Sequence, residues 1–229
     1  MRRTTVLVLA GTAVVAAGAS AVAEAGGASH GPIVTVRIEG AKKTLQRSIP
    51  IKTGTGWITK YGAPKGKCPA RSAQGALDVV THGRWKGTWS TQFNEYFVTS
   101  ILGEKPAGHD FWEIFVNNTA ASKGGCDLKL QRGEQLLFAD TSGKDQPSAL
   151  TAPRSATVGT AFAVRLVGYS SKGKARPLSG VSITGNGIRG AKTNSHGVAR
   201  VSARRKGKPV LRAAPKGYIR SEAVVSVSG

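Results

Sequence analysis

Apolar and polar residues alternate along short stretches of the chain from residue 33 onward. Val34, Val36 and Ile38 alternate with polar residues, and the stretches 96–102 and 111–116 are rich in aromatic and β-branched residues. Alternation with a period of two is typical of a β-strand with one buried face. The pattern therefore predicts strands in each of these three places.

One stretch follows a helical period instead. Ser72 is a suitable N-cap, and Gly83 is suited to end a helix just after His82. Between them, apolar residues recur at helical spacing: Ala73, Ala76, Leu77 and Val80. We expect a single helix here, packed against a small sheet.

A hairpin is predicted towards the end of this part of the chain. Residues 128–130 and 136–138 are both leucine-rich, and they flank the turn sequence Arg132-Gly133-Glu134. Two short apolar runs joined by a glycine-containing turn favour antiparallel pairing.

The last 80 residues contain strand patterns only. Apolar alternation occurs in 162–166, 198–203 and 223–227, separated by turns rich in Gly, Asn and Ser. Short strands at such intervals predict an all-β sandwich. The polar stretch that begins with Thr141-Ser142-Gly143 predicts a linker over residues 141–151 between two domains, 33–140 and 152–229.

Charge separates the same two parts. The whole chain carries a net charge of +21 from 33 Lys and Arg and 12 Asp and Glu. Residues 33–151 contain 16 basic and 10 acidic residues (+6), whereas residues 152–229 contain 15 basic residues and one acid, Glu222 (+14). All four tryptophans lie in the first part. This asymmetry predicts domains with different tasks.

The first 25 residues have the features of an export signal. Arg2 and Arg3 precede an apolar run from Val6 to Ala17, and small residues follow at 21–25. This order is typical of a signal peptide. We expect cleavage, a secreted or envelope-associated location and no transmembrane helix afterwards; retention of the segment as an anchor is the alternative.

Export also decides how the two cysteines are interpreted. Cys68 and Cys126 are the only ones in the chain. Outside the cytoplasm such a pair favours a disulfide, with two separate buried thiols as the alternative.

A family resemblance rests on an ordered series of motifs. They are Gly75-Ala76-Leu77, the run 83–89 (GRWKGTW), Ser100 to Glu104, the run 111–118 (FWEIFVNN), and 133–138 (GEQLLF). This series resembles the transcobalamin-like C-terminal domain family of unknown function, over residues 33–140. The resemblance implies a β-grasp fold of the soluble ligand-binding group, in which a mixed sheet wraps one helix. It also implies the disulfide pairing found in exported bacterial members. The chain has no counterpart of the helical barrel of transcobalamins, so cobalamin is not expected as its ligand.

The C-terminal part is similar to bacterial immunoglobulin-like or carboxypeptidase-regulatory-like domains. The matching segments are residues 178–181, the turn 193–199, residues 211–213 and residues 224–227. The resemblance implies a spacer or adhesive module. The expected fold class is thus mainly β: an α+β domain with one helix, then an immunoglobulin-like sandwich.

Tryptophans are the candidates for ligand binding. Trp85 and Trp89 are flanked by Arg84, Lys86 and Gly87, and Trp57 lies in a Gly-rich stretch. Indoles beside cations suit stacking on a sugar or another flat ligand. The alternative is that Trp85 and Trp89 fill the core, as small domains often require.

Basic residues are the candidates for binding polyanions. They gather around two predicted turns: Arg200, Arg204, Arg205, Lys206 and Lys208 in one, and Lys172 and Lys174 in the other. Such a rim attracts anionic envelope polymers or lipid surfaces. The few aromatic residues nearby argue against specific nucleic-acid recognition. Solvated charge without a partner is the alternative.

No catalytic, metal or cofactor site is predicted. The stretch 62–68 has one residue too few between its glycines for a Walker loop and lacks the following Ser or Thr. The four histidines occur singly. We therefore expect a non-enzymatic exported protein whose first domain binds a ligand or glycan and whose second holds it at the envelope. A purely structural or adhesive surface protein is the alternative.

Overall fold

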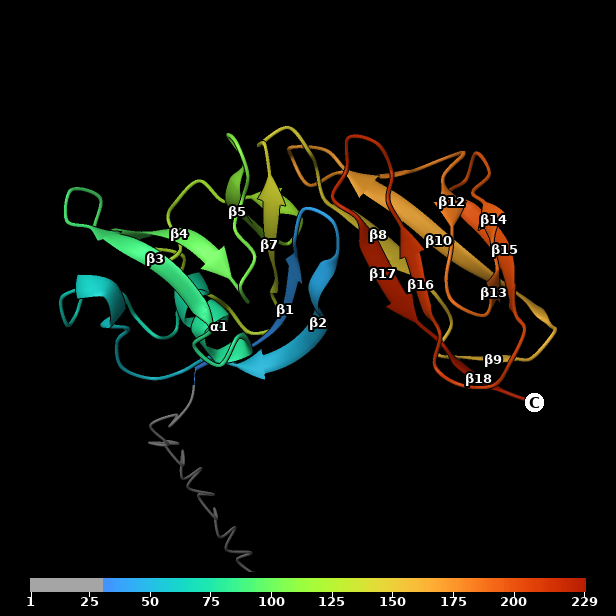
Figure 1. Ribbon diagram of the computed structural model, residues 1–229, viewed down its shortest axis with the longest axis horizontal. Coiled ribbons are helices and arrows are strands. Elements are labelled where there is room, and N and C mark those ends of the chain that lie inside the picture. The colour runs from blue at the N-terminus through green and yellow to red at the C-terminus, as the bar shows by residue number, and fades with distance from the viewer. Residues whose placement is uncertain (1–30) are drawn as a thin grey trace, which may run out of the picture.

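The computed structural model describes residues 31–229; the predicted signal peptide lies outside the described residues. The protein is mainly β with a single α-helix, as the sequence predicts. Figure 1 shows two regions side by side. We call residues 31–141 the first region and residues 148–229 the second region.

A mixed five-stranded sheet forms the centre of the first region, in the order β2-β1-β7-β5-β6. β1 pairs antiparallel with β2 and parallel with β7, and β7 pairs antiparallel with β5. The strands are β1 (Ile33–Glu39), β2 (Thr44–Lys52), β5 (Phe111–Val116), β6 (Thr119–Ala120) and β7 (Gln135–Thr141). A separate hairpin joins β3 (Trp85–Ser90) and β4 (Glu95–Ile101).

The predicted helix is confirmed as α1 (Ala73–Val80), and a short 3-10 turn, η1 (Lys60–Gly62), precedes it. The Ser72 hydroxyl accepts a hydrogen bond from the Gly75 amide at 3.3 Å, the N-cap interaction that the sequence predicts. At the other end Gly83 has φ +74° and its amide donates to the Asp78 carbonyl at 2.8 Å. The left-handed residue directly after the C-cap Thr81 is His82 (φ +51°), whose amide donates to the Val79 carbonyl at 3.1 Å. The two hydrogen bonds together end the helix in a Schellman motif.

The predicted hairpin over 128–138 is wrong. Residues 128–130 form no strand; instead the Leu128 carbonyl accepts a hydrogen bond from the Ala73 amide at the start of α1. Residues 136–138 belong to β7, whose two edges are already occupied by β1 and β5. Non-local pairing left no edge for the local hairpin.

The second region consists of strands and turns. Its main sheet has the order β11-β10-β15-β13, and β8 pairs antiparallel with β10 as well. Residues 148–151, which the sequence analysis assigned to the linker, form β8. These strands are β8 (Ser148–Thr151), β10 (Ala161–Tyr169), β11 (Ala175–Pro177), β13 (Ile188–Arg189) and β15 (Val198–Ala203).

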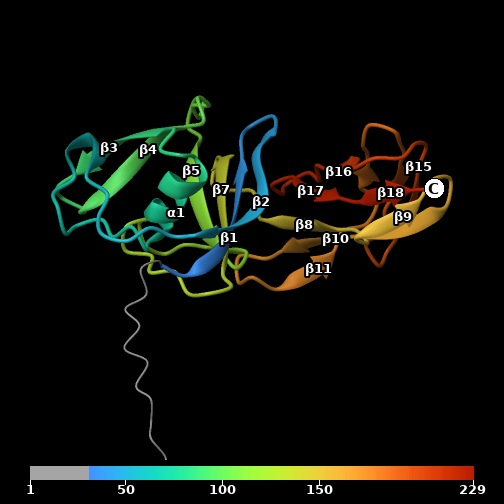
Figure 2. The ribbon, with the colours of Figure 1, turned by 90° about the horizontal axis from the view of Figure 1, so that it is seen from below.

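Shorter pairs complete the second region: β12 with β14, β16 with β17, and β9 with β18. In Figure 2, β16 to β18 lie above β8 and β10, and an apolar core that includes Leu166, Val201 and Leu211 fills this region. These strands are β9 (Ser155–Thr157), β12 (Ser182–Ile183), β14 (Ala191–Lys192), β16 (Val210–Ala213), β17 (Ser221–Val224) and β18 (Ser226–Ser228).

Both faces of the first sheet are covered. Val34, Val36 and Ile38 pack with α1 in the core of the first region. On the opposite face, Phe115, Leu137 and Ala139 form a small buried cluster with Ile219 of the second region. The alternation of β1 thus places one face against the helix and the other against the second region, not against solvent.

Candidate functional site

Trp85 is a core residue. Only 2% of it is exposed, and its indole Nε1 donates to Asp78 Oδ1 at 2.7 Å. Its ring stands edge-on to Tyr96 with 5.0 Å between centroids, and Lys60 Nζ lies 5.4 Å from the indole centroid. Lys60 is also paired with Asp78 at 2.7 Å, so this cation is engaged within the fold. Arg84 and Lys86, the cations that the sequence places beside Trp85, are exposed.

Trp89 and Trp57 do not complete a ligand surface with Trp85. Trp89 packs edge-on against Tyr96 at 5.0 Å and lies partly buried on the same core. Trp57 is 45% exposed and lies apart, in an isolated bridge with Pro69. Five surface cavities of the described residues are lined by other side chains. The arrangement favours the alternative in which Trp85 and Trp89 fill the core.

The basic residues, in contrast, gather around three neighbouring cavities. Three neighbouring cavities of about 280, 740 and 490 Å³ share the lining residue Arg212, and the last two also share Lys42 and Arg220. We call these three cavities together the basic groove. Its lining contains nine basic residues and one acid, Glu222. The nine are Lys42, Lys43, Arg47, Arg205, Lys206, Lys208, Arg212, Lys216 and Arg220.

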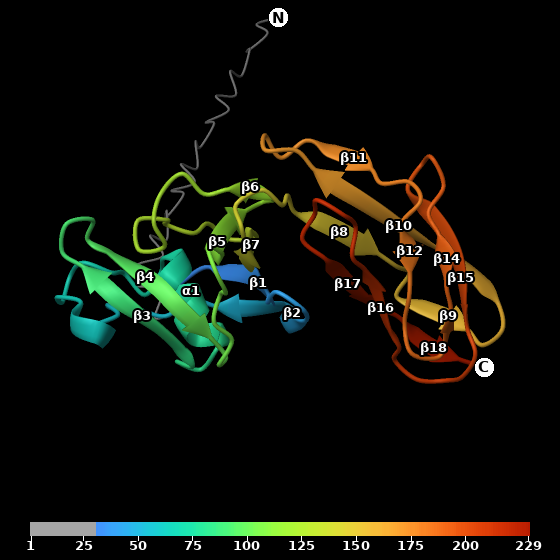
Figure 3. The same ribbon diagram turned by 45° about the horizontal axis from the view of Figure 1, so that its top comes forward.

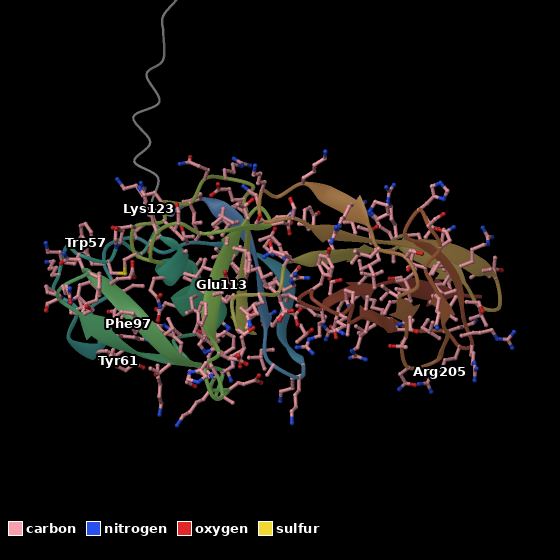
Figure 4. The ribbon with its side chains drawn as sticks, turned by 90° about the horizontal axis from the view of Figure 1, so that it is seen from above. Trp57, Tyr61, Phe97, Glu113, Lys123 and Arg205 are labelled. Atoms are coloured by element: carbon pink, nitrogen blue, oxygen red, sulfur yellow. A yellow bond between two sulfur atoms is a disulfide. The ribbon has the colours of Figure 1, made fainter. Side chains whose placement is uncertain are left out.

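Only three of the predicted polyanion-binding residues line the basic groove: Arg205, Lys206 and Lys208. Arg200 and Arg204 are exposed but do not line it. Lys172 and Lys174 are exposed in the turn between β10 and β11, where Gly173 approaches Thr119 of the first region. In Figure 4 Arg205 lies towards the end of the second region that is farther from the first.

Sequence reasoning missed six members of the groove, and three of these come from the first region. Lys42, Lys43 and Arg47 lie on the β1–β2 turn and on β2, next to β17. The pair Lys42-Lys43 after Glu39-Gly40 was the feature of the sequence that could have indicated a basic surface here. Nothing in the sequence indicated that this turn meets the second region.

Two carboxylates engage cations at the groove. Arg212 Nε lies 2.7 Å from Glu222 Oε1, and Arg220 Nε lies 3.0 Å from Glu39 Oε2. The other seven basic residues of the groove form no ion pair within the described part of the chain. Uncompensated cations along a concave surface raise the local concentration of anions.

Glu39 also joins the two regions. It is 1% exposed, accepts from Thr44 Oγ1 at 2.8 Å and lies 3.7 Å from Arg37 Nε. Burial raises the pKa of Glu39, and Arg37 opposes that shift; burial lowers the pKa of Arg37. Arg220 further donates to the Gly40 carbonyl, and Arg37 Nη2 donates to the Ser148 carbonyl at 3.3 Å. We call this arrangement the Glu39 latch.

The Cys68–Cys126 disulfide is present, with 4.7 Å between the Cα atoms. Both cysteines are buried, and no free cysteine remains in residues 31–229. The bond ties the segment before α1 to the loop before β7. It supports the first region and supplies no reactive thiol.

Neither a metal centre nor a membrane span is found in the part of the chain that the structure describes. No three His, Cys, Asp or Glu side chains come together there in a group that could hold a metal ion. The described helices include none with the length and apolarity needed to cross a membrane.

Comparison with known proteins identifies one segment. Residues 83–141 match a family described as a domain of unknown function (DUF4430). The match runs from the end of α1 through β7 and so covers the hairpin β3–β4 and strands β5 to β7. No curated protein matches the chain.

Proposed function

We propose that this protein is an exported, non-catalytic binding protein that is held at the cell envelope by the basic groove. The groove binds anionic polymers or an anionic lipid surface through its Lys and Arg side chains. The first region carries the ligand-binding function. Secretion follows cleavage of the signal peptide within residues 21–25.

The observation that carries this proposal is the composition of the groove, with nine basic residues and one acid. A polyanion that lies along it displaces its counterions, and their release drives binding. Affinity gained in this way falls as salt rises. Electrostatic retention does not require a defined chemical sequence in the polymer, which suits envelope polymers better than specific nucleic-acid targets.

The domain families proposed for the two regions are consistent with their topologies. A mixed sheet with one helix on one face is what a transcobalamin-like β-grasp domain requires. Facing strands around one core are what an immunoglobulin-like domain requires. We keep both assignments as part of the proposal.

A structural or adhesive role without a small ligand is the second candidate. It is favoured by the burial of Trp85 and the partial burial of Trp89, because the predicted aromatic ligand surface is then absent. The two candidates differ in whether the first region binds any small molecule.

Binding to isolated cell envelopes over a salt series tests the proposal. The groove variant carries Lys206→Gln, Lys208→Gln and Lys216→Gln; a control variant carries Lys172→Gln, Lys174→Gln and Lys192→Gln. All six lysines are exposed residues of the second region, and both variants remove three charges. We expect the groove variant to bind about tenfold more weakly at low salt and the control to change little. Equal losses in both variants would show that net charge, not the groove, causes retention.

A further inference from the structure

A second cavity, unrelated to the basic groove, lies between β4 and β5 of the first region. Its volume is about 340 Å³. We call it the aromatic pocket. Its fourteen lining residues come from Gln74 of α1, from β4, from β5, from the loop 121–125 and from β7. All of these residues except Gln74 lie in the segment 83–141 that matches the family of unknown function.

The pocket exists because two strand edges face one another without pairing. β4 pairs only with β3. On the side of β5 away from β7, β6 pairs only with Phe115 and Val116. The Ala121 amide closes one end by donating to the Ile114 carbonyl at 2.8 Å. Residues 95–98 and 111–114 therefore line the pocket without pairing with one another. Figure 3 shows β4 and β5 as strands of two separate sheets.

Aromatic rings form the walls and flank the opening. Tyr96, Trp112 and Phe138 are buried, whereas Phe97 is 58% exposed and Phe111 is 49% exposed. Two large apolar rings exposed at the mouth of one cavity are a feature of binding sites more than of an inert surface. None of these five rings is one of the tryptophans that the sequence analysis selected.

One polar side chain of the pocket already has hydrogen-bond partners within the protein, whereas several others have buried atoms without a partner in the described residues. Glu95 accepts hydrogen bonds from the Cys126 amide at 2.9 Å and the Tyr96 amide at 3.0 Å, so it holds the loop of the disulfide. Glu113 forms no ion pair in the described residues, and its Oε2 is buried without a hydrogen-bond partner. Gln74 Nε2 and Trp112 Nε1 are also buried without partners in the residues that the structure describes.

The electrostatics around Glu113 favour a cation. Burial raises the pKa of Glu113, and the nearby carboxylate of Asp145 raises it further. Lys123 is the one basic residue in the lining, and it is exposed. In Figure 4 Lys123 and Phe97 lie to the left of Glu113, one above it and one below it. In a chain of net charge +21, this is an aromatic cavity with a carboxylate that lacks a cationic partner.

We propose that the aromatic pocket binds a small organic cation, with an apolar ring between Phe97 and Phe111 and an ammonium group at Glu113. Aromatic faces attract cations, and the carboxylate supplies the compensating charge. This inference names the ligand class of the first region and rests on the ligand-binding part of the proposed function; it does not depend on retention by the basic groove.

Three probes that share an indol-3-ylethyl group and carry a cationic, neutral or anionic terminal group test the ligand class. They are tryptamine (cationic), tryptophol (neutral) and indole-3-propionate (anionic). Binding to the purified protein is measured by calorimetry, and amide chemical shifts locate the site. We expect tryptamine to bind most tightly, with shifts concentrated in β4, β5 and residues 121–125. Preference for the anion, no detectable tryptamine binding, or shifts spread over the whole surface would overturn the proposal.

Substitutions in the lining test the assigned residues. Glu113→Gln is expected to weaken tryptamine binding about tenfold, because it removes the paired charge with little change in shape. Asp127→Asn is the matched control, since it removes the same charge from an exposed residue outside the lining and is expected to weaken binding far less than Glu113→Gln. Phe97→Leu is expected to weaken binding because it removes an exposed ring that few core contacts require.

Lys123→Gln provides a test with the opposite sign. Removal of this cation is expected to strengthen tryptamine binding about twofold, whereas an anionic ligand would bind more weakly. Weaker tryptamine binding by Lys123→Gln, or equal effects of Glu113→Gln and Asp127→Asn, would contradict the proposal. Envelope retention of Glu113→Gln is expected to equal that of the unmodified protein, so failure of the pocket is distinguished from failure of the groove.

Discussion

The two regions of this protein use different means of stabilisation and offer different surfaces. The first region contains the helix, the disulfide and all four tryptophans. The second region is built from strands around an apolar core and has one acid among its many basic residues. Charge and aromatic content therefore distinguish the two regions, but the regions are not independent units in space. The Glu39 latch and the cluster around Ile219 join them, and the basic groove takes residues from both.

The largest expected effect is the loss of stability of the first region when its disulfide is removed. The double variant Cys68→Ser/Cys126→Ser is expected to lose about 4 kcal/mol of unfolding free energy, because the bond closes a long loop. The sequence separation of the two cysteines is 58. Urea denaturation followed by tryptophan fluorescence reports on the first region alone, since all tryptophans lie there.

Amide hydrogen exchange in β10 and β15 of the same variant serves as the control for the second region. We expect protection there to change far less than protection in β1 and β7. An equal loss of amide protection in both regions would show that they unfold together and that the disulfide does not stabilise the first region alone.

The next effect concerns the junction between the regions. Arg220→Met is expected to cost about 3 kcal/mol, because it leaves the buried Glu39 carboxylate without its closest cation. Arg212→Met, which breaks the more exposed pair with Glu222, is expected to cost less than about 1 kcal/mol. A double-mutant cycle of Arg220→Met with Glu39→Gln measures the interaction free energy between these two side chains. A value near zero would show that the Glu39 latch does not stabilise the junction.

A smaller effect tests the role of the tryptophans within the first region. Trp85→Phe is expected to cost about 2 kcal/mol, because it removes the hydrogen bond from the indole to the Asp78 carboxylate. Trp57→Phe at the exposed position is expected to change stability by less than about 0.5 kcal/mol. Comparable costs in chemical denaturation would mean that the two indoles do not differ as core and surface residues.

The sequence predicted local elements well and contacts between distant segments poorly. The α1 cap at Ser72 and the strands β1, β4 and β5 were visible because periodicity and capping are local properties. The place of β7 between β1 and β5, and the pairing of Ser148–Thr151 with β10, depend on partners far along the chain. A linker and a hairpin were predicted in those places for that reason.

The same limit explains the candidate sites. Lys206 and Lys208 were found as a charge run, but Lys42 joins them only because the β1–β2 turn lies beside the second region. The aromatic pocket forms from facing strand edges, which leave no signature in the sequence of either strand. Trp85 was a candidate by composition, and burial decided its role.

The smallest effect is confined to alkaline pH and to the first region. Burial, with a further contribution from the Asp78 carboxylate, raises the pKa of Tyr96 to about 12. The hydroxyl donates to the Lys60 carbonyl at 2.6 Å. A folded-state pKa above the ordinary value of about 10 contributes stability that is complete below pH 10 and is lost as pH rises towards 12. Tyrosinate absorbance in an alkaline titration, compared with that of Tyr96→Phe, isolates this step; its appearance near pH 10 in folded protein would contradict the shift.

The central claim is that the basic groove, and not net charge, binds polyanions. The most direct test is the affinity for a linear polyphosphate of fixed length, measured by calorimetry from low to high salt. We compare the unmodified protein with the Lys206→Gln/Lys208→Gln/Lys216→Gln variant and the Lys172→Gln/Lys174→Gln/Lys192→Gln control. The slope of log affinity against log salt is expected to fall by about two units in the groove variant and to stay unchanged in the control. Equal slopes in the two variants would contradict the account.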